Sequence, residues 1–223
     1  MSVIQLVTAV FEGEISEEEV PYLRGNMIRL SGDDPLFHNH QGEGFYYTYP
    51  LVQYKRINGC AALVGINQGA EALMRLLGKE GDYLFQLGKR TANLGKVILR
   101  SESFSLACDG GEPSYMYFLK RWLPLNEKNY RIFQRTESLS ERITMLERIL
   151  VGNILSFAKG VGFFFESPVV CRLSQMNSSK WTMYKDVDLM TFTVEFRSNV
   201  RLPDYVGLGK SVSMGHGVVK MKR

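Results

Sequence analysis

The chain has 223 residues, of which 45% are hydrophobic and 22% are charged, and its net charge is +4 at pH 7. This length allows one large domain or two small ones, and the composition is that of a soluble globular protein. No apolar run approaches the roughly 20 residues of a membrane-spanning helix, and no signal peptide is recognisable at the N-terminus, so we expect no membrane partner.

The N-terminal half has the strand and helix order of a ferredoxin-like domain. The expected elements are a strand over 2–12, a helix over 17–30, a loop over 31–44, strands over 45–57 and 60–66, a helix over 68–77, and strands near 82–87 and 95–106. This order is β-α-β-β-α-β, the split βαβ pattern. We therefore predict an N-terminal ferredoxin-like domain over residues 1–110.

The C-terminal half is less regular but follows a similar order. A strand is expected over 115–119, Ser138 and Glu141 form a capping-box pattern before a long helix that ends near Gly160, and later strands are expected. These later strands cover residues 163–173, 180–185, 189–199 and 217–222. We interpret residues 111–223 as a second, degenerate ferredoxin-like domain. The predicted fold class is α+β, with two tandem ferredoxin-like domains and a C-terminal glycine-rich loop.

The C-terminal segment from Leu202, LPDYVGLGKSVSMGHGVVKMKR, combines glycines with basic residues. Its glycines and the residues between them that we single out are Gly207, Gly209, Lys210, Ser211, Ser213, Gly215, His216 and Gly217. Glycine lets backbone N–H groups approach a phosphate, and lysine supplies a counter-charge. The segment therefore predicts contact with a phosphate backbone. The alternative interpretation is a turn-rich hairpin beside a basic tail.

Charge is distributed unevenly along the chain. Residues 1–45 carry eight acidic and two basic side chains, whereas the rest of the chain carries 15 acidic and 25 basic ones. A basic body of this kind could hold a polyanion such as a nucleic acid. The basic residues over 120–148 form either a solvated helix face, which is the default, or a face that contacts RNA.

The three cysteines indicate the compartment. Cys60, Cys108 and Cys171 are far apart, odd in number and form no C-x-x-C motif. We expect buried or free thiols, and hence a reducing, cytoplasmic location.

Two of the three histidines, His38 and His40, lie in the predicted loop over 31–44. In an extended segment, side chains at this spacing point to the same side, about 7 Å apart. Histidine titrates near neutrality, so one imidazole could act as a base and the other as an acid on a phosphodiester of RNA. The 2′-hydroxyl would attack the adjacent phosphorus, with no metal or other cofactor.

Two other interpretations of the histidine pair stay open. The H-x-H spacing also suits a metal site, which Asp33, Asp34 and Glu43 could complete. The histidines could instead make only local hydrogen bonds. His216, inside the glycine-rich segment, could stack on a base or reach a phosphate, but an exposed loop residue is its default interpretation.

The aromatic strand after the histidines offers further candidates. Tyr47 is close enough in sequence to hydrogen-bond a phosphate or to position a ribose. Lys55 could neutralise charge in the transition state. Core packing is the alternative for the aromatic residues, and it is the preferred one for Tyr46 and Tyr54.

The motifs LPDYVGLGKSVSMGHG and FHNH…YPLVQYK…LVGINQGAEAL together resemble the CRISPR-associated endoribonucleases that cut precursor CRISPR RNA within each repeat, in particular the type I-B-like subgroup. The resemblance covers both ends of the chain and contributes little over residues 110–180. It implies two ferredoxin-like domains. It also implies a metal-independent cut that leaves a 2′,3′-cyclic phosphate or 3′-phosphate and a 5′-hydroxyl.

The resemblance also implies roles for residues. His38 and His40 would be the acid–base pair, and Tyr47 an orienting group. Residues of the glycine-rich segment would hold the RNA backbone: Gly207, Gly209, Lys210, Ser211 and Ser213. His216 departs from the pattern, because relatives usually carry an aromatic residue there.

CRISPR repeat RNA is the expected partner, and a CRISPR effector complex and a second copy of the chain are further candidates. The main alternative function is a non-catalytic RNA-binding subunit of such a complex. A metal-dependent hydrolase that uses the H-x-H loop is a third interpretation.

Overall fold

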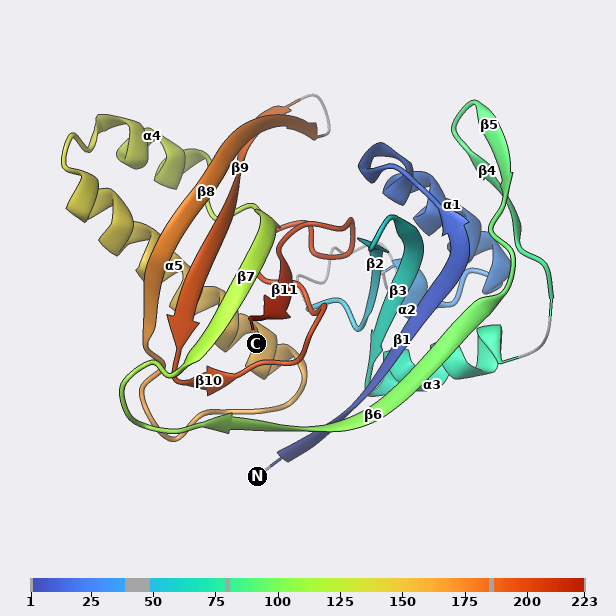
Figure 1. Cartoon of the computed structure of the whole chain (residues 1–223), viewed down its shortest axis with the longest axis horizontal. Helices are drawn as coiled ribbons and strands as arrows, with labels where there is room; N and C mark the ends of the chain where they lie inside the picture. Colours follow the sequence, from blue (N-terminus) through green and yellow to red (C-terminus); the bar gives the residue numbers. More distant parts are fainter. Residues whose placement is uncertain (1, 39–48, 79–80, 185–186, 223) are drawn as a thin grey trace. The chain divides into compact units, whose positions relative to one another are not determined.

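The computed structural model describes residues 2–38, 49–78, 81–184 and 187–222 (Figure 1). The chain divides into two compact units. The N-terminal unit consists of Ser2–Ser105 and Val212–Gly215, and the C-terminal unit consists of Leu106–Ser211 and His216–Arg223. A short piece of the glycine-rich tail, Val212–Gly215, is thus part of the N-terminal unit.

The N-terminal unit is a ferredoxin-like domain built on the order predicted from the sequence. Its elements are β1 (Ser2–Glu14), a 3₁₀ turn η1 (Glu17–Glu19), α1 (Val20–Leu30), α2 (Pro35–His38), β2 (Val52–Ile57), β3 (Cys60–Ile66), α3 (Gln68–Leu77), β4 (Leu84–Leu87), β5 (Arg90–Asn93) and β6 (Val97–Cys108). The sheet order is β6-β1-β3-β2, with β2 at the edge. Both β1 and β2 pair antiparallel with β3.

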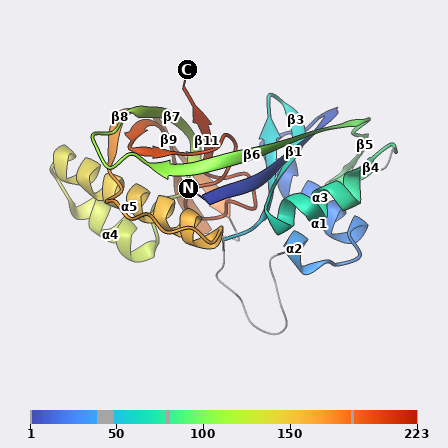
Figure 2. The same cartoon turned by 90° about the horizontal axis from the view of Figure 1, so that it is seen from below.

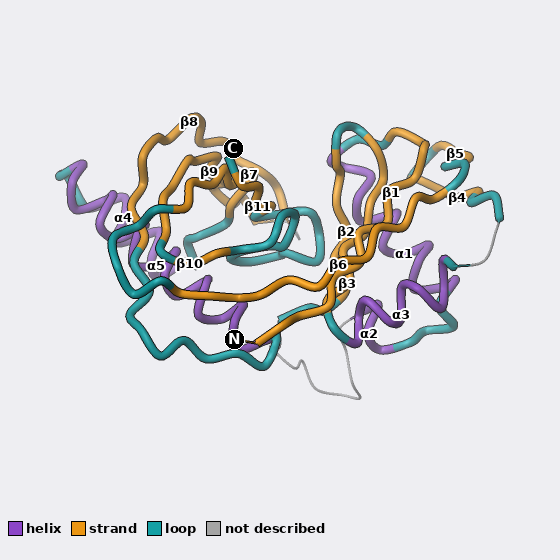
Figure 3. Tube along the Cα trace, turned by 60° about the horizontal axis from the view of Figure 1, so that its bottom comes forward, coloured by secondary structure: helices purple, strands orange, loops and turns teal. Residues whose placement is uncertain are grey.

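The core of this unit lies between the sheet and its helices. Figures 2 and 3 show α1, α2 and α3 on one face of the sheet. Alternate residues of β1, including Val7 and Phe11, pack in one buried cluster with Leu23 of α1 and Leu73 of α3. Strand geometry sends successive side chains to opposite faces, so in β2 Tyr54 joins this cluster while its neighbours in the strand point to the other face.

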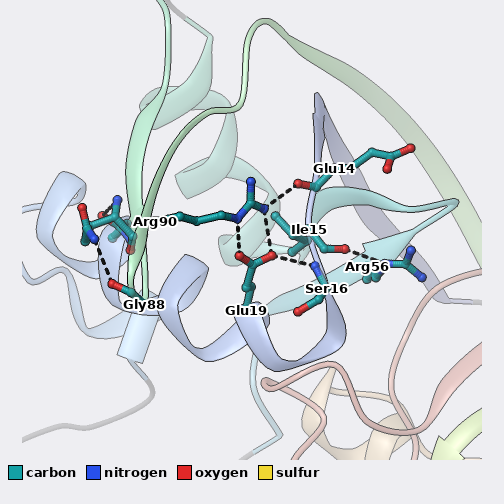
Figure 4. Close-up of polar contacts among 9 residues, drawn as sticks. Glu14, Ile15, Ser16, Glu19, Arg56, Gly88 and Arg90 are labelled. Atoms are coloured by element: carbon teal, nitrogen blue, oxygen red, sulfur yellow. Dashed lines mark hydrogen bonds and ion pairs between the residues drawn. The ribbon is translucent and has the colours of Figure 1, made fainter.

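A polar network fixes the start of α1 (Figure 4). The Glu19 carboxylate accepts from the Ser16 backbone N–H at 2.7 Å, which is half of a capping box, and it also accepts from both Nε and Nη2 of Arg90. Arg90 additionally donates to the Glu14 carbonyl at 3.1 Å. The β4–β5 hairpin is therefore tied to the turn from which α1 begins.

The C-terminal unit repeats the same sheet order with one helix missing. Its elements are β7 (Tyr115–Trp122), α4 (Glu127–Arg135), α5 (Leu139–Gly160), β8 (Cys171–Tyr184), β9 (Val187–Ser198), β10 (Val200–Arg201) and β11 (Val218–Met221), and β10 pairs with the end of β6. The order β11-β7-β9-β8 is again 4-1-3-2 when the four strands are counted along the chain. Figures 1 and 2 show α4 and α5 covering one face of this sheet.

The missing second helix is replaced by the glycine-rich tail, which runs between β10 and β11. Four glycines and Pro203 fall in this segment, and both residue types disfavour a helix. The α+β class and the two ferredoxin-like domains predicted from the sequence are confirmed, and the irregularity of the second domain has this local cause.

Several predicted elements differ from the structure. The helix α2, inside the predicted loop over 31–44, the separate helix α4, capped by the Asn126 side chain, and the strand β5 were not expected. Residues 163–170 form no strand, so that β8 begins only at Cys171. Residues 49–51 are likewise outside β2, where Pro50 lacks the N–H that a strand ladder needs.

The cysteines agree with the sequence expectation. Cys60, Cys108 and Cys171 are free thiols, and burial raises the pKa of Cys171 to about 12. Across the ranges that the structure describes, no helix combines the length and apolar character that crossing a bilayer requires.

Candidate functional site

His38 is the last residue of α2, and its imidazole contacts the backbone of the preceding turn. Its Nε2 lies 3.0 Å from the carbonyl oxygen of Asp33. A carbonyl oxygen can only accept a hydrogen bond, so the ring nitrogen that faces it must carry the proton. In the neutral ring the basic lone pair is then on Nδ1.

The local sequence explains this turn. Gly32 and Asp33 both have left-handed backbone angles, with φ of +66° and +60°. Asp34 then starts α2, because its carboxylate accepts from the Leu36 N–H at 3.0 Å, and Pro35 occupies the first helical position. The chain therefore reverses within a few residues and brings the Asp33 carbonyl opposite the His38 ring.

Two side chains from other elements hold the end of α2. Arg24 of α1 donates from Nη2 to the His38 carbonyl at 2.7 Å. Tyr54 of β2 donates from its hydroxyl to the Phe37 carbonyl at 2.9 Å. Tyr54 is fully buried, and this burial raises the pKa of its hydroxyl well above the usual value. The hydroxyl therefore stays protonated and remains a donor.

Lys55, the next residue of β2, holds a piece of the glycine-rich tail. Its side chain is fully buried, and its ammonium donates to the Val212 carbonyl at 3.2 Å. Burial lowers the pKa of Lys55 to about 7. We expected Lys55 to contact RNA and neutralise charge in the transition state, whereas in the structure its ammonium contacts the tail.

The tail segment lies along the free edge of β2. Ser213 accepts from the Tyr54 N–H at 3.4 Å, and Met214 forms a parallel bridge with Tyr54. Gly215 follows with φ of +80°, a conformation that L side chains rarely adopt. Val212–Gly215 thus contacts the edge strand of the N-terminal sheet through a single parallel bridge.

The flanking parts of the tail form a tight ribbon in the C-terminal unit. Leu208 donates to the Gly217 carbonyl at 2.8 Å, and Gly207 bridges to Val218. A Cβ on Gly217 would lie 1.8 Å from the Leu208 carbonyl oxygen, and one on Gly209 would lie 2.9 Å from the Trp122 ring. Glycine is therefore required by close packing at both positions.

The polar residues of the tail differ in exposure. Lys210 is exposed, although partial burial lowers the pKa of its ammonium, and Ser211 has a left-handed φ of +55°. His216 is only 4% exposed, and its Nδ1 lies 3.3 Å from the Arg121 carbonyl. The default interpretation of His216 as an exposed loop residue was therefore wrong.

The structure brings some of the predicted site residues together. The N-terminal unit contains His38, Lys55 and Ser213. The strand β2 connects them, because Tyr54 binds the residue before His38 and the Ser213 carbonyl, and Lys55 binds the residue before Ser213. Gly207, Gly209, Lys210 and Ser211 belong to the C-terminal unit, as does His216. His40 and Tyr47 lie outside the described residues.

Sequence reasoning missed the roles of Arg24 and Tyr54. Tyr54 was interpreted as a core residue, which is correct for its ring but leaves out its hydroxyl. Arg24 did carry a signal: it lies four residues after Val20 and three before Met27, both fully buried, so it stands beside the apolar stripe of α1. A charged residue in that position needs a partner.

The alternative of a metal site concerns several of the same residues. Among the residues that the structure describes, no three His, Cys, Asp or Glu side chains come together as metal ligands would. Two members of the suggested ligand set, His40 and Glu43, are outside those residues.

Comparisons with known proteins agree over the whole chain. The Cas6b N-terminal domain model matches residues 2–105, and the Cas6b C-terminal domain model matches residues 110–222. A crystal structure of Cas6b superposes with a TM-score of 0.84 at 23% identity, covering 99% of this chain and all of the other. A crystal structure of the CRISPR RNA processing endoribonuclease Cas6b superposes with a TM-score of 0.74 at 22% identity and the same coverage.

A curated sequence relative covers one half of the chain. An uncharacterized protein from Methanocaldococcus jannaschii is 35% identical over 102 residues, which are 46% of this chain and 68% of that protein. The solved structures show the shared fold, and the two family models, one for each ferredoxin-like domain, run from residue 2 to residue 222. The chain belongs to the Cas6b family.

Proposed function

We propose that this protein is a metal-independent endoribonuclease that cleaves precursor CRISPR RNA within its repeats. Membership in the Cas6b family supports a CRISPR RNA processing endoribonuclease. The fold is also that of a structure described as a CRISPR RNA processing endoribonuclease.

The observation that carries the proposal is that two adjacent residues of β2 bind two different segments. Tyr54 binds the end of α2, where His38 lies, and Lys55 binds the tail segment Val212–Gly215. An acid–base group and a candidate phosphate-binding segment are thus fixed to the same short strand. A nuclease needs this combination, because the reacting phosphate must be held where the base can reach it.

In the proposed reaction the RNA supplies its own nucleophile. One imidazole of the pair His38 and His40 removes the proton of a 2′-hydroxyl, whose oxygen then bonds to the adjacent phosphorus. The bond from phosphorus to the 5′-oxygen breaks, and the other imidazole gives that oxygen a proton. The products are a 2′,3′-cyclic phosphate and a 5′-hydroxyl. Tyr47 orients the ribose or phosphate, and backbone N–H groups of the glycine-rich tail hold neighbouring phosphates.

The test is cleavage of a CRISPR repeat RNA by purified protein. The double variant His38→Ala/His40→Ala should lose cleavage by at least about a hundredfold, because a general acid and a general base each contribute on that order. Its affinity for the RNA should stay within severalfold of the wild type. Undiminished cleavage by this variant would remove the mechanism.

Two further reactions separate the alternatives. A repeat RNA with a single 2′-deoxy substitution at the cut site should bind but stay intact, because the internal nucleophile is gone. Cleavage should continue in EDTA, and inhibition that Mn²⁺ or Zn²⁺ reverses would favour the metal-dependent hydrolase. Tight binding of repeat RNA without any cleavage would favour the non-catalytic subunit.

The partners beyond RNA, namely an effector complex and a second copy of the chain, stay predictions, as does the cytoplasmic location. Size-exclusion chromatography with light scattering, with and without repeat RNA, tests the homodimer.

A further inference from the structure

The short helix that carries His38 cannot hold its own geometry. It has only four residues, Pro35–His38, and a helix this short is not stable in water without outside contacts. Its last carbonyls also have no partner within the helix. The direction of the His38 ring therefore depends on the Asp33 carbonyl and also on the groups that bind this turn from outside.

Two such groups act on successive carbonyls. The Tyr54 hydroxyl binds the Phe37 carbonyl from β2, and the Arg24 guanidinium binds the His38 carbonyl from α1. The two donors are also close to each other, because the charge of Arg24 acts on the Tyr54 hydroxyl. Together they form what we call the α2 clamp, made of Arg24 and Tyr54.

The clamp is held at a cost to the fold. The Arg24 Nε is buried and has no hydrogen-bond partner among the described residues. A buried donor left without a partner destabilises the folded state. Packing alone does not explain an arginine at this position, because an apolar side chain of similar volume would avoid this cost. The contact with the His38 carbonyl is what distinguishes arginine from such a side chain.

We propose that Arg24 and Tyr54 are positioning residues for the cleavage reaction. By holding the two carbonyls that end α2, they keep the His38 imidazole with Nε2–H on the Asp33 carbonyl and with Nδ1 as the nitrogen that exchanges a proton with RNA. This inference rests on the proposed function, because it assigns the atom through which His38 takes part. The clamp itself touches neither RNA nor the reacting atoms.

Single-turnover cleavage of a CRISPR repeat RNA measures the effect on rate and on binding separately. Tyr54→Phe removes one oxygen, and Arg24→Met removes the guanidinium while it keeps most of the side-chain volume. We expect each change to lower the cleavage rate constant at saturating RNA by about tenfold, since small misplacements of a reacting group cost up to a hundredfold. The RNA concentration that gives half-maximal rate should change less than twofold. Arg24→Lys should recover part of the lost rate, because lysine also places a donor on a long chain.

The chain offers matched controls for both variants. Tyr117 is also fully buried and donates to a backbone carbonyl, that of Val200, at 3.0 Å. Arg56 donates from Nε to the Ile15 carbonyl at 2.6 Å within the N-terminal unit. Tyr117→Phe and Arg56→Met lose similar contacts to carbonyls that do not belong to α2, so both should cleave at the wild-type rate. Equal losses in these controls and in the clamp variants would reduce the clamp to a general contribution to stability and overturn the proposal.

The tautomer of His38 gives a readout that does not depend on cleavage. The protein has three histidines, so long-range ¹H–¹⁵N spectra of the imidazoles are simple, and comparison with His38→Gln assigns the signals of His38. We expect the Nε2–H tautomer for neutral His38 in the wild type, and a mixture of tautomers in Arg24→Met and Tyr54→Phe. An Nδ1–H tautomer in the wild type, or an unchanged tautomer in both variants, would contradict the inference.

His38→Ala separates this inference from the proposed function. If His38→Ala cleaves as fast as the wild type, the proposed acid–base role of His38 fails. If His38→Ala is slow while Arg24→Met and Tyr54→Phe cleave like their controls, only the positioning role fails. If the proposal is correct, adding Arg24→Met to His38→Ala lowers the residual rate by less than twofold, because the clamp has nothing left to position.

Discussion

Lys55 is a basic residue in a position where a charged side chain is unfavourable. It is a lysine in a fully buried position of β2, and its ammonium donates to one backbone carbonyl, that of Val212. Removing an ammonium from water is unfavourable, which is why burial brings the pKa of Lys55 down to about 7. The tail segment is therefore held by a group whose charge depends on pH.

This placement predicts a pH dependence of stability. The pKa of Lys55 is about 7 in the folded protein against 10.5 as the ordinary value, so between these values the unfolded chain binds more protons. The free energy of unfolding should consequently rise with pH across this window, by up to about 1.4 kcal/mol per pH unit from Lys55. Urea denaturation at pH 7, 8 and 9 measures the rise. Lys55→Met should remove it, whereas Lys96→Met, at an exposed position, should not.

The glycines of the tail make a prediction about backbone fit. Gly217 has φ of +63°, and a Cβ there would meet the Leu208 carbonyl oxygen at 1.8 Å. Gly217→Ala should therefore lower the free energy of unfolding by about 3 kcal/mol or more, from backbone strain and the clash together. Gly25→Ala is the matched control: it lies inside α1 with nothing within 4 Å of a Cβ, so it should raise stability by up to about 1 kcal/mol. Thermal unfolding of the two variants should shift in opposite directions.

At the scale of elements, the sequence predicted most of what depends on periodicity. The strand and helix order of the N-terminal domain, the end of α3 before Gly78 and the long helix α5 all follow from apolar spacing and end signals. The elements that were missed are short or polar. The helix α4 is nine residues long and buries only Phe133, so its apolar pattern is weak.

The candidate site was predictable only in part, for a physical reason. The histidines and the glycine-rich tail stand out because their residue types are unusual at that spacing. The links between them do not stand out, because the contacts of Tyr54 and Lys55 join residues 17 and 157 positions apart. Asn67 shows the same limit: it is the N-cap residue of α3, but its side chain accepts from the Gln5 N–H and not from a backbone N–H of the helix. A single sequence does not show such distant partners.

The network at the start of α1 predicts an acid-sensitive contact between elements. Hydrogen bonding by Arg90 lowers the pKa of Glu19 below 4.5, so its stabilising effect is present above that pH and is lost as pH falls through the lowered pKa. Glu19→Gln should lower the free energy of unfolding at pH 7 by about 1 kcal/mol at most, since Arg90 is half exposed and solvent screens the pair.

Denaturation at pH 7 and at pH 3.5 checks this. The difference between Glu19→Gln and the wild type should shrink at the lower pH. Glu127→Gln breaks an exposed pair with Arg131 on a single helix, so it should have a smaller effect at both pH values. A difference for Glu19→Gln that grows as the pH falls would contradict the assignment.

At the scale of the whole molecule, the chain uses one sheet order twice, and the two copies differ in their helices. The N-terminal domain keeps both helices of the 4-1-3-2 arrangement and carries His38 on an additional helical turn, α2. The C-terminal domain has the glycine-rich tail in place of its second helix. In the proposed nuclease, the first copy supplies acid–base chemistry, and the second supplies most of the segment that holds RNA.

The same division should appear in the salt dependence of RNA binding. The chain beyond residue 45 carries 25 basic side chains against 15 acidic ones, so binding to repeat RNA should weaken steeply as salt rises. Each cation that neutralises a phosphate of single-stranded RNA contributes about 0.7 to the slope of log Kd against log salt.

Lys210 is exposed within the tail. Lys210→Met should therefore lower that slope by about 0.7 and weaken binding at low salt, while Lys96→Met, outside the tail, should leave both unchanged. Filter binding between 50 and 400 mM KCl measures the slopes, and equal slopes for Lys210→Met and the wild type would remove the tail lysine from the RNA interface.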